Sequence, residues 1–347
     1  MSLEATFERV TLELAEPFTI ARGTQTTAEN VIVRVTDEAG MTGIGGAGPA
    51  PHYGETADTV EAVLPSLLAV VEEVGDPHAI SEIETRMGGV VNDNPAARCA
   101  VSIALHDLAA KRLGVPLYRL WGLDPAAVPD TSYTLGLDTT ERVREKAEAA
   151  ADVGYPILKI KLGTDRDREL VEAVKGAAPD ATLRVDANEA WTPRETVRNS
   201  EWLADYDVEF IEQPVPAEDP AGLQFAYERS ALPIAADESC VTLEDIPAIA
   251  DRCDIANLKL MKTGGLLEAR RMIAAARAHG LEVMLGCMAE SNASIAAGAA
   301  LAPLLDYADL DGSLLLAEDP YDGVDLSEGR IRLGDLDVAG TGARPTE

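Results

Sequence analysis

Lysine is rare in this chain, and its positions give the first sign of chemistry. Only seven of the 29 basic residues are lysines, and four of them form two close pairs, Lys159 with Lys161 and Lys259 with Lys262. A lysine ammonium, unlike a guanidinium, becomes a usable base when burial or a neighbouring cation lowers its pKa. A sequence that uses arginine almost everywhere else, yet keeps these pairs, points to lysine chemistry.

Three isolated carboxylates lie between the two lysine pairs, namely Asp186, Glu212 and Asp237. Without a nearby His or Cys, such a set makes an all-oxygen site for a hard divalent cation. Mg²⁺ fits best because it keeps water or substrate oxygens in its remaining positions, and Mn²⁺ could substitute for it. Pairing with arginines is the alternative, but carboxylates clustered this closely need a cation.

These residues follow short apolar segments that alternate with Ala- and Glu-rich helical segments from residue 131 onward. We expect strands over 133–137, 157–162, 182–186, 208–212, 234–237, 255–260, 282–285 and 308–311. Repeated strand–helix units of this kind predict a parallel sheet. Eight of them favour a closed barrel over an open sheet.

Five charged residues fall at or near the ends of these strands: Asp186, Glu212, Asp237, Lys259 and Asp309. The carboxyl ends of barrel strands meet at one mouth, where the chemistry of such enzymes takes place. In an acidic protein a charged residue after a strand is often just the first loop residue. The prediction of a shared site therefore rests on the whole set.

The first lysine pair lies two residues apart on one predicted strand, so Lys159 and Lys161 point to the same face. A cation beside a cation, near a metal, would lower the pKa of one lysine toward neutrality. A solvated pair is the alternative, but the apolar residues around it indicate a strand buried on its other face. The lysines of strands two and six stand across the barrel. A substrate between them could lose a proton to one face and regain it from the other, which is racemisation or epimerisation beside a carboxylate.

The ordered motifs resemble those of the enolase superfamily, its muconate-lactonising subgroup, and in particular the dipeptide epimerases. The matching stretches are Leu158-Lys-Ile-Lys161, Val185-Asp-Ala-Asn188, Ile211-Glu-Gln-Pro214, Ala236-Asp-Glu-Ser239, Asn257-Leu-Lys-Leu-Met-Lys-Thr-Gly-Gly265, Gly286-Cys-Met-Ala-Glu-Ser291 and Asp309-Leu-Asp311. Sites of this superfamily combine a Lys or His base with Mg²⁺. The resemblance implies an α/β fold, a modified TIM-type (β/α)7β barrel with an α+β N-terminal capping domain.

The resemblance also implies a role for each residue of the motifs. Asp186, Glu212 and Asp237 would be metal ligands. Lys161 would be one acid/base, and Lys159 would tune it and touch the substrate carboxylate.

On the opposite face, Lys259 would be the second acid/base, because the family's base sits at the strand end, and Lys262 is its rival. Asp309 and Asp311 resemble the Asp-x-Asp signature that holds the substrate's α-ammonium group, although an acidic loop in an acidic protein gives the same pattern. Arg22 in the capping domain could meet an acidic substrate side chain, or equally be solvated or serve the domain interface. His52 and Tyr53 are further candidates for lining the site.

The chain divides into three parts in this interpretation. Residues 1–120 form the capping domain, with strands over 6–37 and helices over 55–73, 79–90 and 95–113. Residues 121–316 form the catalytic barrel, and the tail over 317–347 packs back on the capping domain.

The composition limits the possible partners and the compartment. A formal net charge of −31 argues against nucleic acid and anionic membranes as partners. Many acidic residues with few lysines are typical of a protein solvated in concentrated salt, so we expect a halophilic protein, an ordinary acidic enzyme being the alternative. Four cysteines without a CxxC spacing fit a reducing compartment, and no signal or membrane segment is evident. We therefore expect a cytoplasmic location. The family resemblance implies a homo-oligomer.

The expected function is a Mg²⁺-dependent epimerase with no organic cofactor, acting on the C-terminal residue of a dipeptide as small-molecule substrate. Muconate cycloisomerisation, N-acylamino-acid racemisation and o-succinylbenzoate-type dehydration use the same scaffold and stay open. A non-catalytic barrel retained for binding is the alternative from another class. The side chains of the substrate are not determined by the sequence.

Overall fold

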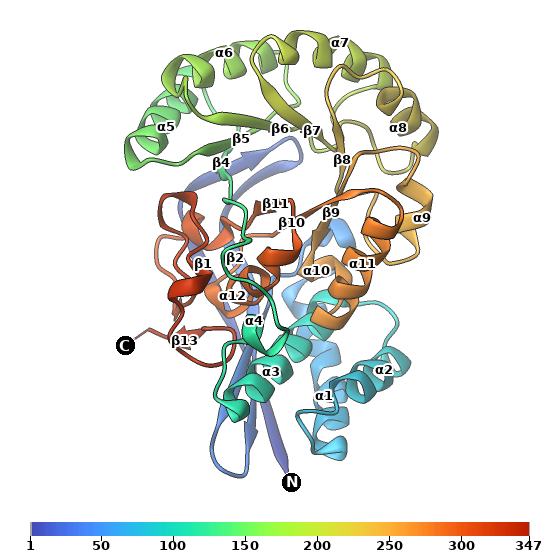
Figure 1. Ribbon diagram of the computed structural model, residues 1–347, viewed down its shortest axis with the longest axis vertical. Helices are drawn as coiled ribbons and strands as arrows, with labels where there is room; N and C mark the ends of the chain where they lie inside the picture. The colour runs from blue at the N-terminus through green and yellow to red at the C-terminus, as the bar shows by residue number, and fades with distance from the viewer. Residues whose placement is uncertain (1, 347) are drawn as a thin grey trace.

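The computed structural model describes residues 2–346, in which an antiparallel sheet with packed helices lies beside an eight-stranded parallel sheet (Figure 1). The N-terminal elements are β1 (Leu3–Ile20), β2 (Gly23–Asp37), β3 (Thr42–Ala47), η1 (Pro51–Tyr53), α1 (Ala57–Val74), α2 (Ile80–Val90), α3 (Pro95–Leu113) and α4 (Leu117–Leu120).

The long β1–β2 hairpin reaches from the N-terminal sheet to the barrel. Its strands pair antiparallel, and the register shifts between Glu13 and Phe18, after which the pairing continues to Ile20 opposite Gly23. Leu137 N donates to Thr19 O at 2.7 Å, so the end of the hairpin is bonded to the segment after β4. Figure 1 shows this end of the hairpin next to the barrel strands. The hairpin therefore carries Arg22 to the barrel.

Two glycines of β3 allow α3 to pack directly against the sheet. A Cβ atom on Gly43 would lie 2.0 Å from Ala104 O, and one on Gly45 would lie 2.1 Å from Ala100 O. Such distances leave no room for any side chain. Because successive residues of a strand point to opposite faces, Gly46 faces the barrel side instead, where Ala293 lies 3.3 Å from its Cβ position.

The helix predicted over 55–73 begins two residues later, at Ala57. Thr56 is its N-cap and forms a capping box with Thr59, which satisfies the free N–H groups of the first turn. Glu55 is buried and accepts instead from Ala96 N at 2.8 Å, at the start of α3. The predicted helix start was wrong because a cap residue and a residue bonded to another helix were counted as helical.

The parallel sheet contains the eight predicted strands in chain order. They are β4 (Tyr133–Leu135), β5 (Ile157–Lys161), β6 (Thr182–Asp186), β7 (Val208–Glu212), β8 (Ile234–Ala236), β9 (Ile255–Lys259), β10 (Glu282–Gly286) and β11 (Tyr307–Asp309). A parallel bridge between Thr131 and Ala308 brings the two ends of the sheet together. The predicted fold class, a modified TIM-type barrel with an α+β capping domain, is confirmed.

The helices that follow these strands surround the sheet (Figure 1). They are α5 (Thr140–Val153), α6 (Asp167–Ala177), α7 (Pro193–Ala204), α8 (Pro220–Tyr227), α9 (Asp245–Ile249), α10 (Leu260–Thr263), α11 (Leu266–Ala278) and α12 (Asn292–Leu301), with the short η2 (Ala302–Leu304) and η3 (Gly312–Leu315) near the last strand. No helix among residues 2–346 is long and apolar enough to cross a membrane.

Five strands end one or two residues earlier than predicted. They are β4, β5, β8, β9 and β11, which stop at Leu135, Lys161, Ala236, Lys259 and Asp309. Asp237 is consequently the first residue after its strand, and Asp311 lies two residues beyond its own. Both still lie at the mouth, because the chain leaves each strand at its carboxyl end.

The tail contains β12 (Tyr321–Asp322), η4 (Ser327–Gly329), η5 (Leu333–Asp335) and β13 (Arg344–Pro345). It contacts N-terminal elements: Arg34 Nη2 donates to Tyr321 Oη at 2.6 Å, and Thr341 N donates to the buried Asp107 at 2.8 Å. The boundaries 1–120, 121–316 and 317–347 stay predictions, and residues 1 and 347 lie outside the described chain.

Candidate active site

The three predicted metal ligands lie side by side at the carboxyl ends of adjacent strands. Asp186 and Glu212 are register partners at the ends of β6 and β7, and Asp237 follows β8. All three residues have no solvent exposure. Because parallel strands end at one edge, they bring together three carboxylates that follow one another at intervals of about 25 residues in the sequence.

Two amide side chains next to these carboxylates were not assigned a role by the sequence analysis. Asn257 Nδ2 donates to Glu212 Oε1 at 2.9 Å. Gln213 Oε1 accepts from Asp237 N at 2.9 Å and from Ser239 N at 3.0 Å, and its backbone has a φ of 31°. Strained backbone of this kind persists where surrounding contacts hold it. The available signal was their position near predicted site residues, since Gln213 directly follows Glu212 and Asn257 lies two residues before Lys259.

Lys159 lies beneath the mouth among carboxylates. Its Nζ lies 2.7 Å from Glu212 Oε2, 2.7 Å from Asp309 Oδ2 and 3.1 Å from Asp186 Oδ2. Burial opposes its charge, but the three carboxylates hold the pKa of Lys159 well above its ordinary value. Lys159 is therefore an ammonium ion that links the predicted metal ligands to Asp309.

Lys161 and Lys259 have access to the mouth, each with a side chain that is 11% exposed. Lys161 Nζ donates to Asp186 Oδ2 at 2.6 Å, and Lys259 Nζ donates to Asp237 Oδ2 at 2.7 Å. The two lysines are thus on opposite sides of the carboxylate set. Burial works against the charge of Lys259, but Asp237 chiefly holds its pKa well above the ordinary value. The sequence analysis expected the pKa of one lysine of the first pair to be lowered by a neighbouring cation and a nearby metal. That expectation depends on the charge of the metal and stays a prediction.

The carboxylate set fits Mg²⁺. Burial, with a further contribution from Asp186, raises the pKa of Glu212 to about 8. Glu212 Oε2 accepts no hydrogen bond within the described chain, although Lys159 Nζ is close to it. A buried set of three carboxylates is the all-oxygen environment that a hard divalent cation stabilises. The ligand roles of Asp186, Glu212 and Asp237 stay predictions.

A second group of possible ligands lies at the rim of the mouth. One nitrogen of His52 and one carboxylate oxygen each of Glu189 and Glu238 lie within 4.8 Å of one another. Arg22 already compensates this group, with Nη2 at 2.8 Å from Glu238 and Nη1 at 3.3 Å from Glu189. The buried carboxylates Asp186, Glu212 and Asp237 stay the predicted metal ligands. Lysine ammonium groups lie against all three, Lys159 against Asp186 and Glu212, and Lys259 and Lys262 against Asp237.

Asp309 and Asp311 are both buried at the end of β11. Asp309 accepts from Ser132 Oγ at 2.5 Å and from Lys159, while Asp311 accepts from Thr134 N at 2.6 Å. Burial and the neighbouring Asp309 raise the pKa of Asp311 to about 6. The structure places the two aspartates close to the lysine and carboxylate set. Their role toward a substrate ammonium stays a prediction.

Arg22 lies at the interface between the hairpin and the barrel, one of the alternatives that the sequence left open. Besides its two ion pairs, its Nη1 donates to Asn188 O at 3.3 Å. Of the capping residues named as lining candidates, Tyr53 Oη lies 3.5 Å from Asp237 Oδ1, and His52 Nε2 lies 3.3 Å from Glu189 Oε2. The hairpin and the loop after β3 thus both reach the mouth.

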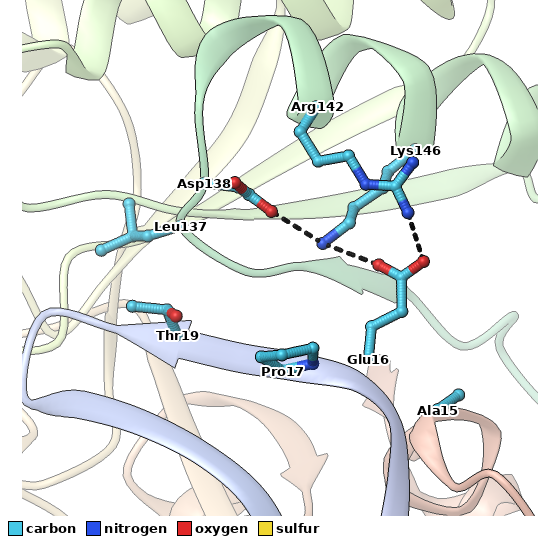
Figure 2. Close-up of a pocket in the computed structure, with 8 residues that line it drawn as sticks. All are labelled: Ala15, Glu16, Pro17, Thr19, Leu137, Asp138, Arg142 and Lys146. Carbon is cyan, nitrogen blue, oxygen red and sulfur yellow. Dashed lines mark hydrogen bonds and ion pairs between the residues drawn. The ribbon is translucent and has the colours of Figure 1, made fainter.

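A surface cleft of about 480 Å³ marks the seam between the hairpin and the barrel (Figure 2). Glu16 of β1 projects into it and pairs with Arg142 and with Lys146, whose Nζ also lies 3.3 Å from Asp138. Its charged groups are paired with one another, and none of the predicted catalytic residues lines it. The cleft contains contacts that attach the hairpin to the barrel.

Fold and site together define a class of barrel enzymes with lysines and carboxylates at the mouth, arranged for metal-assisted proton transfer. Residues 142–347 match the enolase C-terminal domain-like family, and residues 2–122 match the N-terminal domain of the mandelate racemase/muconate lactonizing enzyme family. The chain belongs to this family of the enolase superfamily, as the motifs predicted.

Several of its relatives are named as epimerases that act on dipeptides. An L-Ala-D/L-Glu epimerase of Bacteroides thetaiotaomicron is 39% identical, covering 96% of this chain and 86% of that protein. A hydrophobic dipeptide epimerase of Roseobacter litoralis is 40% identical, covering 94% and 95%. The solved dipeptide epimerase of Enterococcus faecalis, complexed with Mg and L-Leu-L-Tyr, superposes with a TM-score of 0.88 at 35% identity and 99% coverage of both chains.

Proposed function

We propose that this protein is a Mg²⁺-dependent dipeptide epimerase that removes and returns the α-proton of the C-terminal residue. The observation that carries the proposal is the placement of Lys161 and Lys259 on opposite sides of the buried carboxylates, each with access to the mouth. Inversion at a carbon needs a proton donor and a proton acceptor on opposite faces, and this arrangement supports these roles for the two lysines. The dipeptide epimerases among its relatives support the same reaction.

The roles follow from position and charge. Asp186, Glu212 and Asp237 would hold Mg²⁺, which supplies positive charge to the substrate carboxylate when it is bound. One of the two mouth lysines takes the α-proton onto Nζ, and the other gives a proton to the opposite face. Which lysine acts first depends on the isomer.

The substrate's free amino group distinguishes a dipeptide from other substrates of this scaffold. Asp309 and Asp311 offer buried negative charge next to the site, which suits an ammonium group. A muconate or an N-acylamino acid carries no ammonium group at the corresponding end. The acidic pair therefore favours dipeptides over the cycloisomerase, acylamino-acid racemase and succinylbenzoate alternatives.

The deciding experiment is proton NMR in D₂O with Mg²⁺ and molar KCl, following loss of the α-proton across a library of L,L-dipeptides. Exchange at the C-terminal residue of some members is the expected result, and the rates rank the side chains. If a folded, metal-bound protein exchanges no member of the library, the dipeptide proposal fails and the muconate and acylamino-acid substrates are tested next.

We further infer a halophilic, cytoplasmic protein that assembles as a homo-oligomer. The net charge of −31 supports a cytoplasm with a high salt concentration. Four cysteines without a disulfide among the described residues support a reducing compartment. Light scattering in molar KCl tests the assembly, since a monomeric mass would contradict it.

A further inference from the structure

The second lysine pair contains one lysine with access to the mouth and one without. The side chain of Lys259 is 11% exposed, and that of Lys262 has no exposure. The first pair shows the same division between Lys161, at 11%, and Lys159, at 2%. Each pair thus contains one buried lysine, Lys159 or Lys262, and one accessible lysine, Lys161 or Lys259.

All three N–H donors of Lys262 have protein acceptors. Its Nζ donates to Asp237 Oδ1 at 2.6 Å, to Asp237 O at 2.7 Å and to Asn257 O at 2.9 Å. An ammonium group has three donors and no acceptor, so these bonds use its full capacity. By contrast, the one hydrogen bond of Lys259 Nζ within residues 2–346 goes to Asp237 Oδ2. Lys259 can turn toward a substrate after losing a single bond, whereas Lys262 would have to break three.

The surroundings of Lys262 close it off from the mouth. Its Nζ lies 5.8 Å from the centre of the Tyr53 ring, a cation–π contact with the capping domain. The one-turn helix α10 carries Lys262 and is capped by Gly264, which has a φ of 80°. A Cβ atom at Gly264 would lie 2.9 Å from Arg98 of α3, so this turn is also packed against the capping domain.

We propose that Lys262, unlike the proton-transferring Lys259 of the proposed function, is a positioning residue that ties Asp237, after β8, to Asn257 in the middle of β9. The bonds to the backbone and carboxylate of Asp237 fix both the position of this predicted ligand and its orientation. A carboxylate oxygen has two lone-pair sites, so Asp237 Oδ1 can keep Lys262 and still serve a cation. This inference rests on the proposed epimerase function.

The test compares Lys262→Met and Lys259→Met, with Lys175→Met on α6 as a matched loss of one lysine far from the site. Exchange of the α-proton for deuterium is followed from the L,L and the L,D isomer of one dipeptide at saturating Mg²⁺. Lys259→Met is expected to remove exchange from one isomer only. Lys262→Met is expected to slow exchange of the α-proton from both isomers by the same factor, about tenfold or more, because both reactions need a correctly placed Asp237.

A second readout needs no substrate. Mn²⁺ bound to Lys262→Met is expected to give a broadened electron paramagnetic resonance spectrum, because a ligand that is no longer fixed samples several orientations. Mn²⁺ bound to Lys175→Met is expected to give the spectrum of the unmodified protein. A purely structural role for Lys262 elsewhere would leave the spectrum unchanged.

Two results would overturn the proposal. One is selective loss of exchange from a single isomer in Lys262→Met with an unchanged Mn²⁺ spectrum, which would make Lys262 the base. The other is no change in either readout.

Reductive methylation of the wild-type protein followed by mass spectrometry covers the case in which Lys262→Met does not fold. Lys262 is expected to stay protected while Lys259 reacts, and equal reaction would refute the proposal. If no dipeptide exchanges at all, the proposed function fails, while methylation and the Mn²⁺ spectrum still report on Lys262.

Discussion

Arg22 Nη2 lies 2.8 Å from Glu238 Oε1, so the tip of the capping hairpin is paired with the residue next to Asp237. The Glu238 side chain is only 1% exposed, and its Oε2 has no hydrogen-bond partner within the described chain. Because Glu189 also lies 3.3 Å from Arg22, one guanidinium is shared by two carboxylates. The positive charge of Arg22 is therefore compensated by the barrel.

Replacing Arg22 by Met is expected to lower kcat/KM for acidic and apolar C-terminal residues by a similar factor, on the order of tenfold. Removing Arg22 leaves the buried carboxylate of Glu238 uncompensated, which disturbs the contact between hairpin and barrel for every substrate. The measurement compares two dipeptides that differ only at the C-terminal side chain. Arg9→Met, at an exposed ion pair with Asp58, is the control. A loss confined to the acidic dipeptide would show that Arg22 contacts the substrate side chain.

Asp311→Asn is expected to raise KM for a dipeptide by about tenfold to a hundredfold, since a hydrogen bond to a charged group contributes about 1.5–3 kcal/mol. Asp311 is a sharper target than Asp309, because Asp309 also holds Lys159 and Ser132. An unchanged KM for the dipeptide would remove the main argument against the other substrates of this scaffold.

Mg²⁺ is expected to raise the unfolding temperature by a few degrees in calorimetry without substrate. Binding to the folded state alone contributes about 2.7 kcal/mol at a hundredfold excess over Kd. Asp186→Asn should abolish this increase, whereas the exposed Glu244→Gln should keep it. A full increase in Asp186→Asn would place the metal elsewhere, with the rim group around Glu238 as the next candidate.

The interface between α2, α3 and α11 contains two groups with opposite pH dependence. Burial raises the pKa of Glu84 to about 7, above its ordinary 4.5, so the folded state binds this proton more tightly and stability falls as pH rises between these values. Burial lowers the pKa of His106 to about 4, below its ordinary 6.5, so stability rises with pH over that window. Ser102 Oγ links the two, 2.5 Å from Glu84 Oε1 and 3.5 Å from His106 Nδ1.

Glu84→Gln removes the titrating carboxyl group whose raised pKa makes the stability of the wild type fall as pH rises. Relative to the wild type, its free energy of unfolding is expected to increase from pH 4.5 to pH 7 by on the order of 2 kcal/mol, a value reduced for the partial exposure of Glu84. Urea unfolding across this range measures the difference. A constant difference between the two proteins would mean that Glu84 titrates normally in the folded state.

KCl is expected to raise the unfolding temperature strongly between about 0.1 M and about 1 M, where the screening length falls from about 10 Å to about 3 Å. The net charge of −31 makes self-repulsion the dominant cause. Sucrose, which screens no charge, should stabilise less at equal osmolarity. A flat response to KCl would favour the ordinary acidic enzyme.

The sequence alone determined the barrel and the residues at its mouth. Short apolar segments set the eight strands, and polar residues such as Glu212 and Lys259 at their ends had to meet because parallel strands end at one edge. These signals lie within short segments of the chain, so they can be recognised from the sequence alone. The starts and ends that were missed, among them those at Ala57, Leu135 and Ala236, depend on caps and pairings with other elements.

Only the tertiary structure decided which lysine of each pair is accessible and what holds each carboxylate. That Lys262 bonds to Asp237 and Asn257, that Ser132 bonds to Asp309, and that Arg22 meets Glu238 follow from contacts between loops far apart in the chain. No periodicity in sequence encodes them. Their physical origin is the burial of charge, which forces each ammonium and each carboxylate to find a partner once the folded chain has excluded water.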